Sequence, residues 1–195
     1  LKSAFSAQEC AALPAAVVSA VIKKCKCNLW PSLPVSLQVK LLYPYDTTIS
    51  FGGYSWNVLE IRKDRALLLM NGLCYTGALC GSSEKTPIDW DTCYAHKYLN
   101  GTFLEKLKSK KQGEICCNQD GDYVFLLSKS EVEQYLEYKQ MAVFNGAWWL
   151  RDVSNYDEFS IASCVDSFRQ ISTQYPSYEK DAHGNSLGYR PALWV

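Results

Sequence analysis

The side chains best suited to covalent, redox or metal chemistry in this chain are its nine cysteines and two histidines. The cysteines are Cys10, Cys25, Cys27, Cys74, Cys80, Cys93, Cys116, Cys117 and Cys164. Because nine is an odd number, at least one thiol lacks a partner within the chain. The spacing is irregular, and a chain of this length can fold without disulfides. We therefore expect mostly reduced, buried thiols. The alternative is one or two disulfides, and Cys74 with Cys80 is the pair best placed to close a loop.

Metal binding and nucleophilic catalysis both lack a motif. Neither closely spaced cysteine pair has zinc-finger spacing, and no second pair or histidine cluster stands at the right distance. No serine, cysteine or glutamate has a base at a defined spacing. We predict that the chain is not an enzyme and uses neither metal nor cofactor. His96 is expected at the surface or the boundary of a helix, and His183 lies in a turn, where ligand contact is the alternative to a structural role.

The composition indicates one globular domain, or a domain with an appendage. Of the 195 residues, 48% are apolar and 21% are charged, which excludes a disordered tail. The 20 basic and 20 acidic side chains cancel, so no net basic field attracts nucleic acid. The basic cluster between Lys106 and Lys111 is typical of a solvated helix end.

The longest apolar stretch, residues 11–22, is too short for a bilayer and no signal cleavage site follows it. Since the chain begins with Leu1 rather than Met, we expect a processed product or a fragment.

The first half of the chain predicts a helix, a strand and a hairpin. A capping box at residues 6–9 starts the helix, which Pro14 kinks or divides. Apolar residues alternate with polar ones over residues 35–41, which predicts a half-buried strand. Residues 54–61 and 66–70 predict the two strands of a hairpin with a polar turn between them. Gly52 and Gly53 indicate a bend or bulge before the hairpin.

The second half predicts three helices and a β-rich end. Asp91 is expected to cap a helix over residues 92–99, Asn100 and Gly101 to end it, and Thr102 to start another. Residues 123–127 predict a short strand, and the capping box at residues 128–131 predicts one more helix. From residue 142 onward, short apolar runs alternate with polar stretches rich in aromatic residues, which favours strands and loops.

Tryptophans and arginines are expected to build the framework. We expect Trp148, Trp149 and Trp194 in the core, with a sugar-stacking platform as the alternative. Arg151 and Arg190 are expected to hold loops together, because a planar guanidinium can fix two strands at once. Ligand contact is the alternative for both arginines.

Six motifs stand in a fixed order along residues 48–195. They are FGGYSWNVL at 51–59, ALLL at 66–69, WDTC to KYLNG at 90–101, VFLLS at 124–128, WWLR at 148–151 and GYRPALW at 188–194. This order resembles a large bacterial domain family with the pattern GGYxWRVL, ALLLS, WETCxLRxYLN, IFLLS, WWLRSPG and GVRPALW. That family is similar to the C-type-lectin-like fold, which formylglycine-generating enzymes and the variable proteins of diversity-generating retroelements also use.

The resemblance implies an α+β protein. It would have a C-type-lectin-like domain over residues 46–195, preceded by a helix-and-strand extension over residues 1–45. Such domains bring their ends together, so residues 188–195 are expected to form a strand that lies in the sheet near the hairpin of residues 54–61. In the variable proteins the hypervariable stretch lies between the WW motif and the terminal motif. Carried onto this chain, that stretch is residues 152–187.

The residue types in this stretch agree with a displayed binding surface. Tyrosine offers a large contact area at low entropic cost, serine and asparagine adapt their hydrogen bonds, and most of these types arise from an asparagine codon by changes of adenine. The expected ligand-binding residues are Asn155, Tyr156, Asp157, Phe159, Ser163, Asp166, Phe168, Arg169, Ser172, Tyr175, Tyr178, His183 and Asn185. We expect the exposed members to gather on one surface above buried Trp148, Trp149 and Leu193.

The sequence thus predicts a non-catalytic protein that binds a protein or glycan ligand on a cell surface, with no nucleic-acid partner and no membrane insertion. An oligomer is possible, and the expected location is a cell surface, the medium or a phage particle. The alternatives are a structural or adhesive module without diversification and an enzyme of the formylglycine-generating type.

The sequence departs from the family pattern at two places. Residues 152–154 replace Ser-Pro-Gly, and Cys164 stands alone where such an enzyme has paired cysteines. No lectin calcium motif is present.

Overall fold

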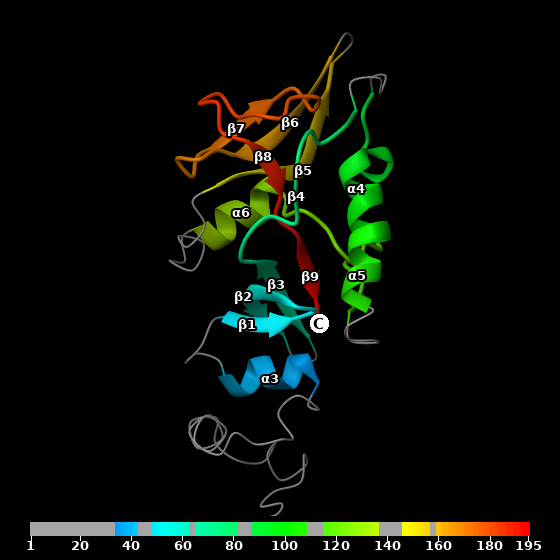
Figure 1. Cartoon of the computed structure of the whole chain (residues 1–195), viewed down its shortest axis with the longest axis vertical. Coiled ribbons are helices and arrows are strands. Elements are labelled where there is room, and N and C mark those ends of the chain that lie inside the picture. The colour runs from blue at the N-terminus through cyan, green and yellow to red at the C-terminus, as the bar shows by residue number, and fades with distance from the viewer. Residues whose placement is uncertain are drawn as a thin grey trace, which may run out of the picture.

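The computed structural model describes residues 34–42, 48–62, 65–81, 87–108, 115–136, 146–156 and 159–195 (Figure 1). The helix expected at the N-terminus, its three cysteines and the predicted binding residue Asp157 lie outside these ranges. The described residues form an α+β structure with two sheets, and the buried apolar side chains of both sheets and of the helices belong to one core.

The first sheet contains the predicted hairpin. Its strands are β1 (Thr48–Phe51), β2 (Tyr54–Ile61), β3 (Ala66–Met70) and β9 (Ala192–Trp194), in the antiparallel order β1-β2-β3-β9. The turn between β2 and β3 is closed by a hydrogen bond of 2.8 Å from the Arg62 N–H to the Arg65 carbonyl. The predicted bend is also present: Gly52 and Gly53 have φ values of 58° and 83°, a left-handed region that glycine occupies without strain.

The strand expected over residues 188–195 was only partly right: residues 192–194 complete this sheet as β9, whereas residues 187–189 form a strand of the second sheet. β9 lies antiparallel to β3, and the Ala66 N–H donates to the Val195 carbonyl at 2.8 Å. On its other side Ala192 exchanges two backbone hydrogen bonds with Phe125, of 3.0 and 2.7 Å. The strand predicted for residues 123–127 was wrong, because that segment makes only this isolated bridge with β9 among the described residues. The segment is nevertheless buried, since residues 124–127 are all inaccessible.

The second sheet contains the β-rich end of the chain. Its strands are β4 (Tyr75–Thr76), β5 (Ala147–Asn155), β6 (Ser160–Val165), β7 (Ile171–Gln174) and β8 (Leu187–Tyr189), in the order β4-β8-β5-β6-β7. The β5–β8 pair is parallel and the other pairs are antiparallel. The hairpin of β5 and β6 projects from the end of the molecule opposite α3 (Figure 1).

The strand expected over residues 35–41 was wrong, because this segment is the helix α3 (Val35–Leu42). The Pro34 carbonyl accepts hydrogen bonds from Leu37 and Gln38, both of 3.0 Å, which starts the helix. Val35 and Val39 are buried four residues apart, on one helical face, and Gln38 lies beside them. Residues 35 and 39 fit both patterns: they belong to a run of apolar residues at every second position, and they also have the i, i+4 spacing of a helix. The alternation therefore did not distinguish a strand from a helix.

The helix boundaries expected around Asp91 and Asn100 were also wrong. Asp91 lies inside a 3-10 turn (Trp90–Thr92), and the helix α4 (Tyr94–Tyr98) begins after Cys93. A π-helical turn (Leu99–Phe103) then continues directly into α5 (Leu104–Lys108). Asn100 does not end the helix because its side chain is used elsewhere. It donates to the Val124 carbonyl at 2.9 Å and accepts from the N–H groups of Tyr123 and Val124.

The helix α6 (Lys129–Leu136) starts with the predicted capping box. The Glu131 N–H donates to the Ser128 hydroxyl at 3.2 Å, and the Ser128 N–H donates to the Glu131 carboxylate at 2.7 Å. Each residue thus satisfies a backbone donor of the other, which is why the local sequence alone located this helix start.

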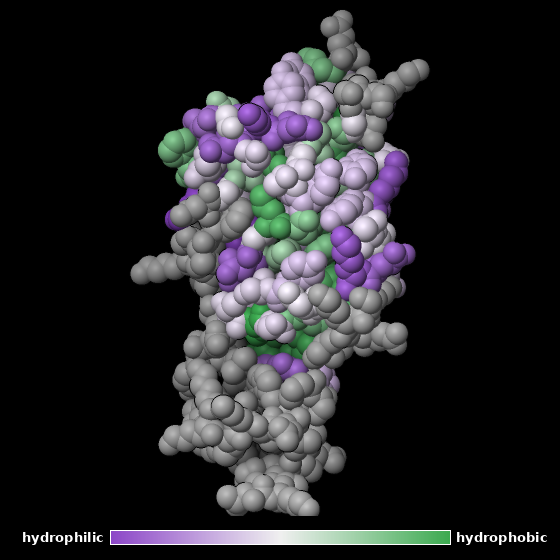
Figure 2. All heavy atoms as spheres, in the orientation of Figure 1, coloured by the Kyte–Doolittle hydropathy of each residue, from purple (hydrophilic) through white to green (hydrophobic). Residues whose placement is uncertain are grey.

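The six described cysteines are free thiols, so Cys74 and Cys80 are not bonded to each other. Cys80, Cys93 and Cys164 are buried, Cys74 is half-buried, and the adjacent Cys116 and Cys117 are exposed. No helix among the described residues is long and apolar enough to span a bilayer. On the face seen in Figure 2, hydrophobic side chains of the described residues form small separate patches among polar ones.

Candidate binding surface

Four exposed aromatic side chains gather at the projecting end of the second sheet. Tyr156 and Phe159 flank the turn between β5 and β6, where the Tyr156 N–H donates to the Phe159 carbonyl at 2.8 Å. Tyr175 and Tyr178 flank the turn that follows β7, closed by a 2.9 Å hydrogen bond between their backbones. We call these four side chains the aromatic face. Their exposed fractions lie between 42% and 51%.

The rings of the aromatic face form a continuous chain of contacts. Tyr156 stacks on Phe159 with centroids 4.9 Å apart and planes at 22°. Phe159 meets Tyr175 edge-on at 6.2 Å, and Tyr175 packs against Tyr178 at 5.3 Å and 55°. Each ring therefore contacts at least one neighbour, and each residue still leaves about half of its surface exposed. Such pairs prefer tilted and offset geometries, which makes the surface ridged rather than flat.

A second exposed group lies at the opposite end of β6 and β7. Phe168, 66% exposed, packs edge-on against His183 at 4.5 Å. Arg169 follows it in the turn between β6 and β7 with a φ of 66°, a strained value for a non-glycine residue. Asn185 donates to the Ser167 hydroxyl at 2.9 Å, which ties this turn to the loop before β8. We call Phe168, Arg169, His183 and Asn185 the turn group.

Two buried carboxylates hold the turn group. Asp166 Oδ1 accepts the N–H groups of Phe168 and Gln170, both at 2.9 Å. Asp181 Oδ1 accepts those of His183 and Asn185 at 2.9 and 2.8 Å, and its Oδ2 accepts that of Ser167 at 3.2 Å. Burial opposes ionisation of Asp181, but these backbone donors outweigh it and hold its pKa below the usual value. Asp166 was predicted to contact ligand; it is buried and shapes a loop instead.

The expectation of a single surface was therefore only partly right. Most of the predicted aromatic and polar residues are exposed, but Asp166 is buried, and the exposed ones form two groups, one at each end of the six-residue strand β6. An extended strand rises about 3.3 Å per residue, so the two groups stand roughly 20 Å apart. One small ligand cannot contact both groups, whereas a protein surface can.

Three other predicted residues are weaker candidates because they are half-buried or bonded to other parts of the chain. Asn155 is exposed, but its side-chain amide bonds the backbone of Ile88 in both directions, at 2.9 Å each, and so fixes the loop before the 3-10 turn. Ser163 and Ser172 are half-buried in β6 and β7, and the Ser172 hydroxyl lies 3.2 Å from the Cys164 sulfur. Burial and these contacts make all three weaker candidates for ligand contact than the aromatic face.

The framework beneath these groups consists of the expected core residues. Trp148 is 1% exposed, and Trp149 and Leu193 are fully buried. The Trp149 indole N–H donates to the Gly77 carbonyl at 2.9 Å. Arg190 is buried as well: its Nε–H donates to the Met70 carbonyl at 2.9 Å, and its guanidinium lies 4.7 Å from the Trp148 ring centroid. Arg190 thus joins the two sheets, the structural role expected for it.

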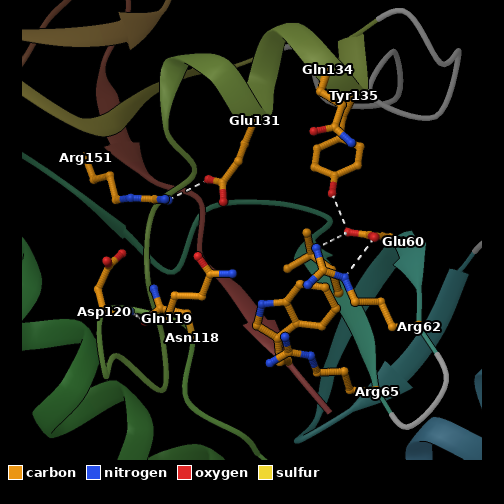
Figure 3. Close-up of a pocket in the computed structure, with 12 residues that line it drawn as sticks. Glu60, Arg62, Arg65, Asn118, Gln119, Asp120, Glu131, Gln134, Tyr135 and Arg151 are labelled. Atoms are coloured by element: carbon orange, nitrogen blue, oxygen red, sulfur yellow. Dashed lines mark hydrogen bonds and ion pairs between the residues drawn. The ribbon is translucent and has the colours of Figure 1, made fainter.

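A polar cavity of about 190 Å³ opens between the β2–β3 hairpin, α6 and the loop at residues 118–120 (Figure 3). Four of its charged side chains form two ion pairs. Arg62 bonds Glu60 at 2.9 Å, and Arg151 bonds Glu131 at 2.5 Å and the Leu126 carbonyl at 2.8 Å. The hydrogen bond from Arg62 is the main reason why the pKa of Glu60 is lowered, and the Tyr135 hydroxyl adds a second one at 3.0 Å. The Tyr135–Glu60 bond fastens α6 to the first sheet, and the Arg151–Glu131 pair fastens it to β5 of the second sheet, which is a structural role of the kind expected for Arg151.

In a comparison with protein families, residues 64–195 match a family described as a domain of unknown function, DUF6273. This match covers more than half of the chain. The chain belongs to the DUF6273 family. The matched part of the DUF6273 domain runs from β3 to β9, so it includes the aromatic face, the turn group and the polar cavity's α6 side. Neither the curated proteins nor the solved structures contain a match.

Two described thiols of the DUF6273 domain are poor nucleophiles. Burial raises the pKa of Cys74 to about 12. Burial also raises the pKa of Cys164, although the Ser172 hydroxyl acts in the opposite direction. A thiol attacks only as the thiolate, and both groups are protonated at neutral pH.

Sequence reasoning missed one cluster of chemically capable side chains. Asp91, His96 and Asp122 bring one oxygen or nitrogen each to within 4.8 Å of one another. His96 is half-buried in α4, as expected for a boundary residue, and its Nε2 lies 2.7 Å from Asp122 Oδ1, a contact that the sequence did not indicate. Asp91 lies in the 3-10 turn and Asp122 in a distant loop, so no sequence spacing relates them both to the histidine. The one local indication of the cluster was that His96 follows the 3-10 turn by about one helical turn.

Proposed function

We propose that this DUF6273 domain is a non-catalytic binding protein that contacts another protein through its aromatic face. The observation that supports this is the contiguous set of Tyr156, Phe159, Tyr175 and Tyr178, each about half exposed. Exposed tyrosines in contact with one another are characteristic of binding surfaces, because they provide large contact area with few rotatable bonds. A domain without a partner gains nothing from exposing them together.

The separation between core and display supports the same proposal. The four side chains of the aromatic face lie at two turns, whereas Trp148 and Trp149, which hold the sheet, are buried in the first half of β5. Side chains on such turns can be replaced without loss of the fold, as a diversified surface requires. We infer that the domain has the C-type-lectin-like arrangement, which the pairing of β9 with β3 and the display of turns by a second sheet support. We extend the proposal to a variable protein of a diversity-generating retroelement.

A protein ligand fits the geometry better than a glycan. A sugar ring stacks on a flat aromatic platform, but the planes of the four rings differ by 22° to 67° from one neighbour to the next. A ridged surface suits protruding side chains of a partner. The turn group, roughly 20 Å away along β6, would lie at the edge of a protein interface of ordinary size.

The experiment compares peptide and glycan binding by matched variants. A phage-displayed random-peptide library and a glycan array are each tested with the parent, with the triple variant Tyr156→Ser/Tyr175→Ser/Tyr178→Ser, and with Tyr94→Ala. Tyr94 is 45% exposed on α4, away from the aromatic face, and serves as the control. We expect selected peptides to bind the parent and Tyr94→Ala but not the triple variant. Each truncated tyrosine at a binding centre costs roughly 1–4 kcal/mol of affinity.

Two outcomes would reject the proposal. Peptides that bind the triple variant as well as the parent would place binding elsewhere, and glycans that require the three tyrosines would replace the protein ligand with a sugar. The melting temperature of the triple variant must stay within a few degrees of the parent, since its side chains are half exposed. The retroelement is tested separately, by a reverse-transcriptase gene beside the coding sequence and a near-identical repeat of its 3′ end.

A further inference from the structure

The cluster of Asp91, His96 and Asp122 has the composition of a metal site. Asp91 comes from the 3-10 turn, His96 from α4, and Asp122 from the loop that follows residues 118–121. Their nearest oxygen and nitrogen atoms lie within 4.8 Å of one another, and His96 Nε2 is 2.7 Å from Asp122 Oδ1. Three segments that are separate in the sequence thus point one donor atom each at a common place.

The carboxylate of Asp122 is held in a fixed orientation. Asp122 is 6% exposed, and its Oδ2 accepts the indole N–H of Trp90 at 2.9 Å. Its backbone is fixed by Asn118, whose side chain accepts the Asp122 N–H at 2.9 Å and whose N–H donates to the Asp122 carbonyl at 2.8 Å. The Trp90 ring also packs edge-on against the His96 ring at 5.3 Å. Metal ligands are typically oriented in this way by a second layer of hydrogen bonds, which leaves Oδ1 directed toward His96.

We propose that Asp91, His96 and Asp122 bind a divalent first-row transition ion, with water in the remaining positions. Imidazole is a ligand for zinc, cobalt and their neighbours, whereas calcium and magnesium select oxygen ligands alone. Bonds of about 2.1 Å place neighbouring ligand atoms roughly 3.0–3.4 Å apart. The His96–Asp122 spacing is close to this value, and the exposed Asp91 side chain is free to close the remaining gap. The two carboxylate charges balance the charge of the ion.

This site would stabilise the side of the domain on which the aromatic face is built. It joins the 3-10 turn, α4 and the loop at residues 118–122. The adjoining residue Ile88 is bonded by Asn155 at the end of β5, one residue before Tyr156. An ion that binds only the folded state raises the free energy of unfolding by mass action. The inference stands on the cluster itself and does not depend on the proposed binding function.

The test is calorimetric titration of the chelator-treated protein with Co²⁺ alone, together with the visible and near-ultraviolet spectrum of the complex. We expect one ion per chain and a spectrum without the intense thiolate charge-transfer band that cysteine ligands produce. Asp91→Asn and His96→Gln should weaken Co²⁺ binding by at least about tenfold, while Ca²⁺ and Mg²⁺ should not compete. Asp89→Asn is the control, since Asp89 is exposed and its side chain does not cap the 3-10 turn.

Three results would overturn the proposal. Absence of Co²⁺ binding would leave His96 and Asp122 as a hydrogen-bonded pair only. A thiolate spectrum would place the ion on cysteines. Unchanged affinity in Asp91→Asn would remove the exposed ligand from the site. Because Asp91 is exposed, its variant folds even if His96→Gln does not, so the test remains decisive.

Discussion

Leu193 in β9 lies directly opposite Leu68 in β3, and both side chains are fully buried. This pair joins the last strand of the chain to the predicted hairpin and places the C-terminus inside the sheet rather than in solvent. We expect Leu193→Ala to lower the free energy of unfolding by about 2–5 kcal/mol, because a cavity replaces close packing. Urea denaturation measures it, and Leu37→Ala on the half-buried side of α3 is the control. A loss below about 1 kcal/mol would show that this strand pairing is not part of the stable core.

A glycine is required at position 188, where β8 pairs with β4. A Cβ atom there would lie 2.5 Å from the Tyr75 carbonyl oxygen and 2.6 Å from the Leu73 side chain. The carbonyl oxygen belongs to the backbone, so it cannot move away as a flexible side chain could. Gly188→Ala should therefore cost about 1–3 kcal/mol through overpacking. Gly101→Ala is the matched control, since a Cβ there meets no atom within 4 Å and alanine suits a helix. Thermal unfolding of the two variants should move in opposite directions, and equal shifts would contradict the β4–β8 pairing.

The capping box of α6 should contribute measurably to stability. Ser128→Ala removes the hydroxyl that accepts the Glu131 N–H, so we expect a loss of about 1 kcal/mol. Glu133→Gln is the control: Glu133 faces Lys129 at 3.9 Å on the exposed side of the helix, where an ion pair contributes little. Chemical denaturation compares the two. A loss for Glu133→Gln as large as that for Ser128→Ala would argue against the cap.

The loop that carries the turn group should loosen at low pH. The pKa of Asp181 is lowered in the folded chain. Burial alone would raise this pKa, but the backbone N–H donors of Asn185, Ser167 and His183 lower it by more than burial raises it. Its ionised form therefore stabilises the fold above the unfolded pKa, and that contribution is lost as the pH falls through the folded value. The stability difference between the parent and Asp181→Asn should be largest at pH 7 and shrink below about pH 4. Unfolding free energies across this range, with Asp120→Asn as an exposed control, test the sign. A difference that grows on acidification would contradict it.

The described thiols should differ sharply in reactivity. Cys116 and Cys117 are exposed and should react with iodoacetamide in the folded protein, whereas Cys80, Cys93 and Cys164 should react only after denaturation. Peptide mass spectrometry before and after unfolding distinguishes the two classes. Recovery of a peptide pair linked through Cys74 and Cys80 would contradict the free thiols of the structure and favour an oxidising environment.

Local signals in the sequence were sufficient for several elements. Ser128 and Glu131 located a helix start because both partners of the cap lie within four residues. The β2–β3 hairpin was readable because two apolar runs flank a polar turn. The burial of Trp148 and Trp149 followed from the cost of exposing large aromatic side chains, and the apolar residues 191–195 required a partner strand, which β3 supplies.

Other features depend on which distant segments meet. Residues 35–42 carry a pattern compatible with a strand or a helix, and packing of Val35 and Val39 against the first sheet decides for the helix. Asn100 is a helix-ending residue by type, yet the segment at residues 123–124 uses its side chain and the helix continues.

The candidate sites show the same division. The family resemblance and the residue types together led us to expect exposed aromatic residues between 152 and 187, and Tyr156, Phe159, Phe168, Tyr175 and Tyr178 are exposed. Their division into the aromatic face and the turn group follows from the length of β6, because an extended strand separates the turns at its two ends. His96 and Asp122 met only in the folded chain, since a side chain from α4 and one from a distant loop become neighbours through tertiary packing and not through any sequence period.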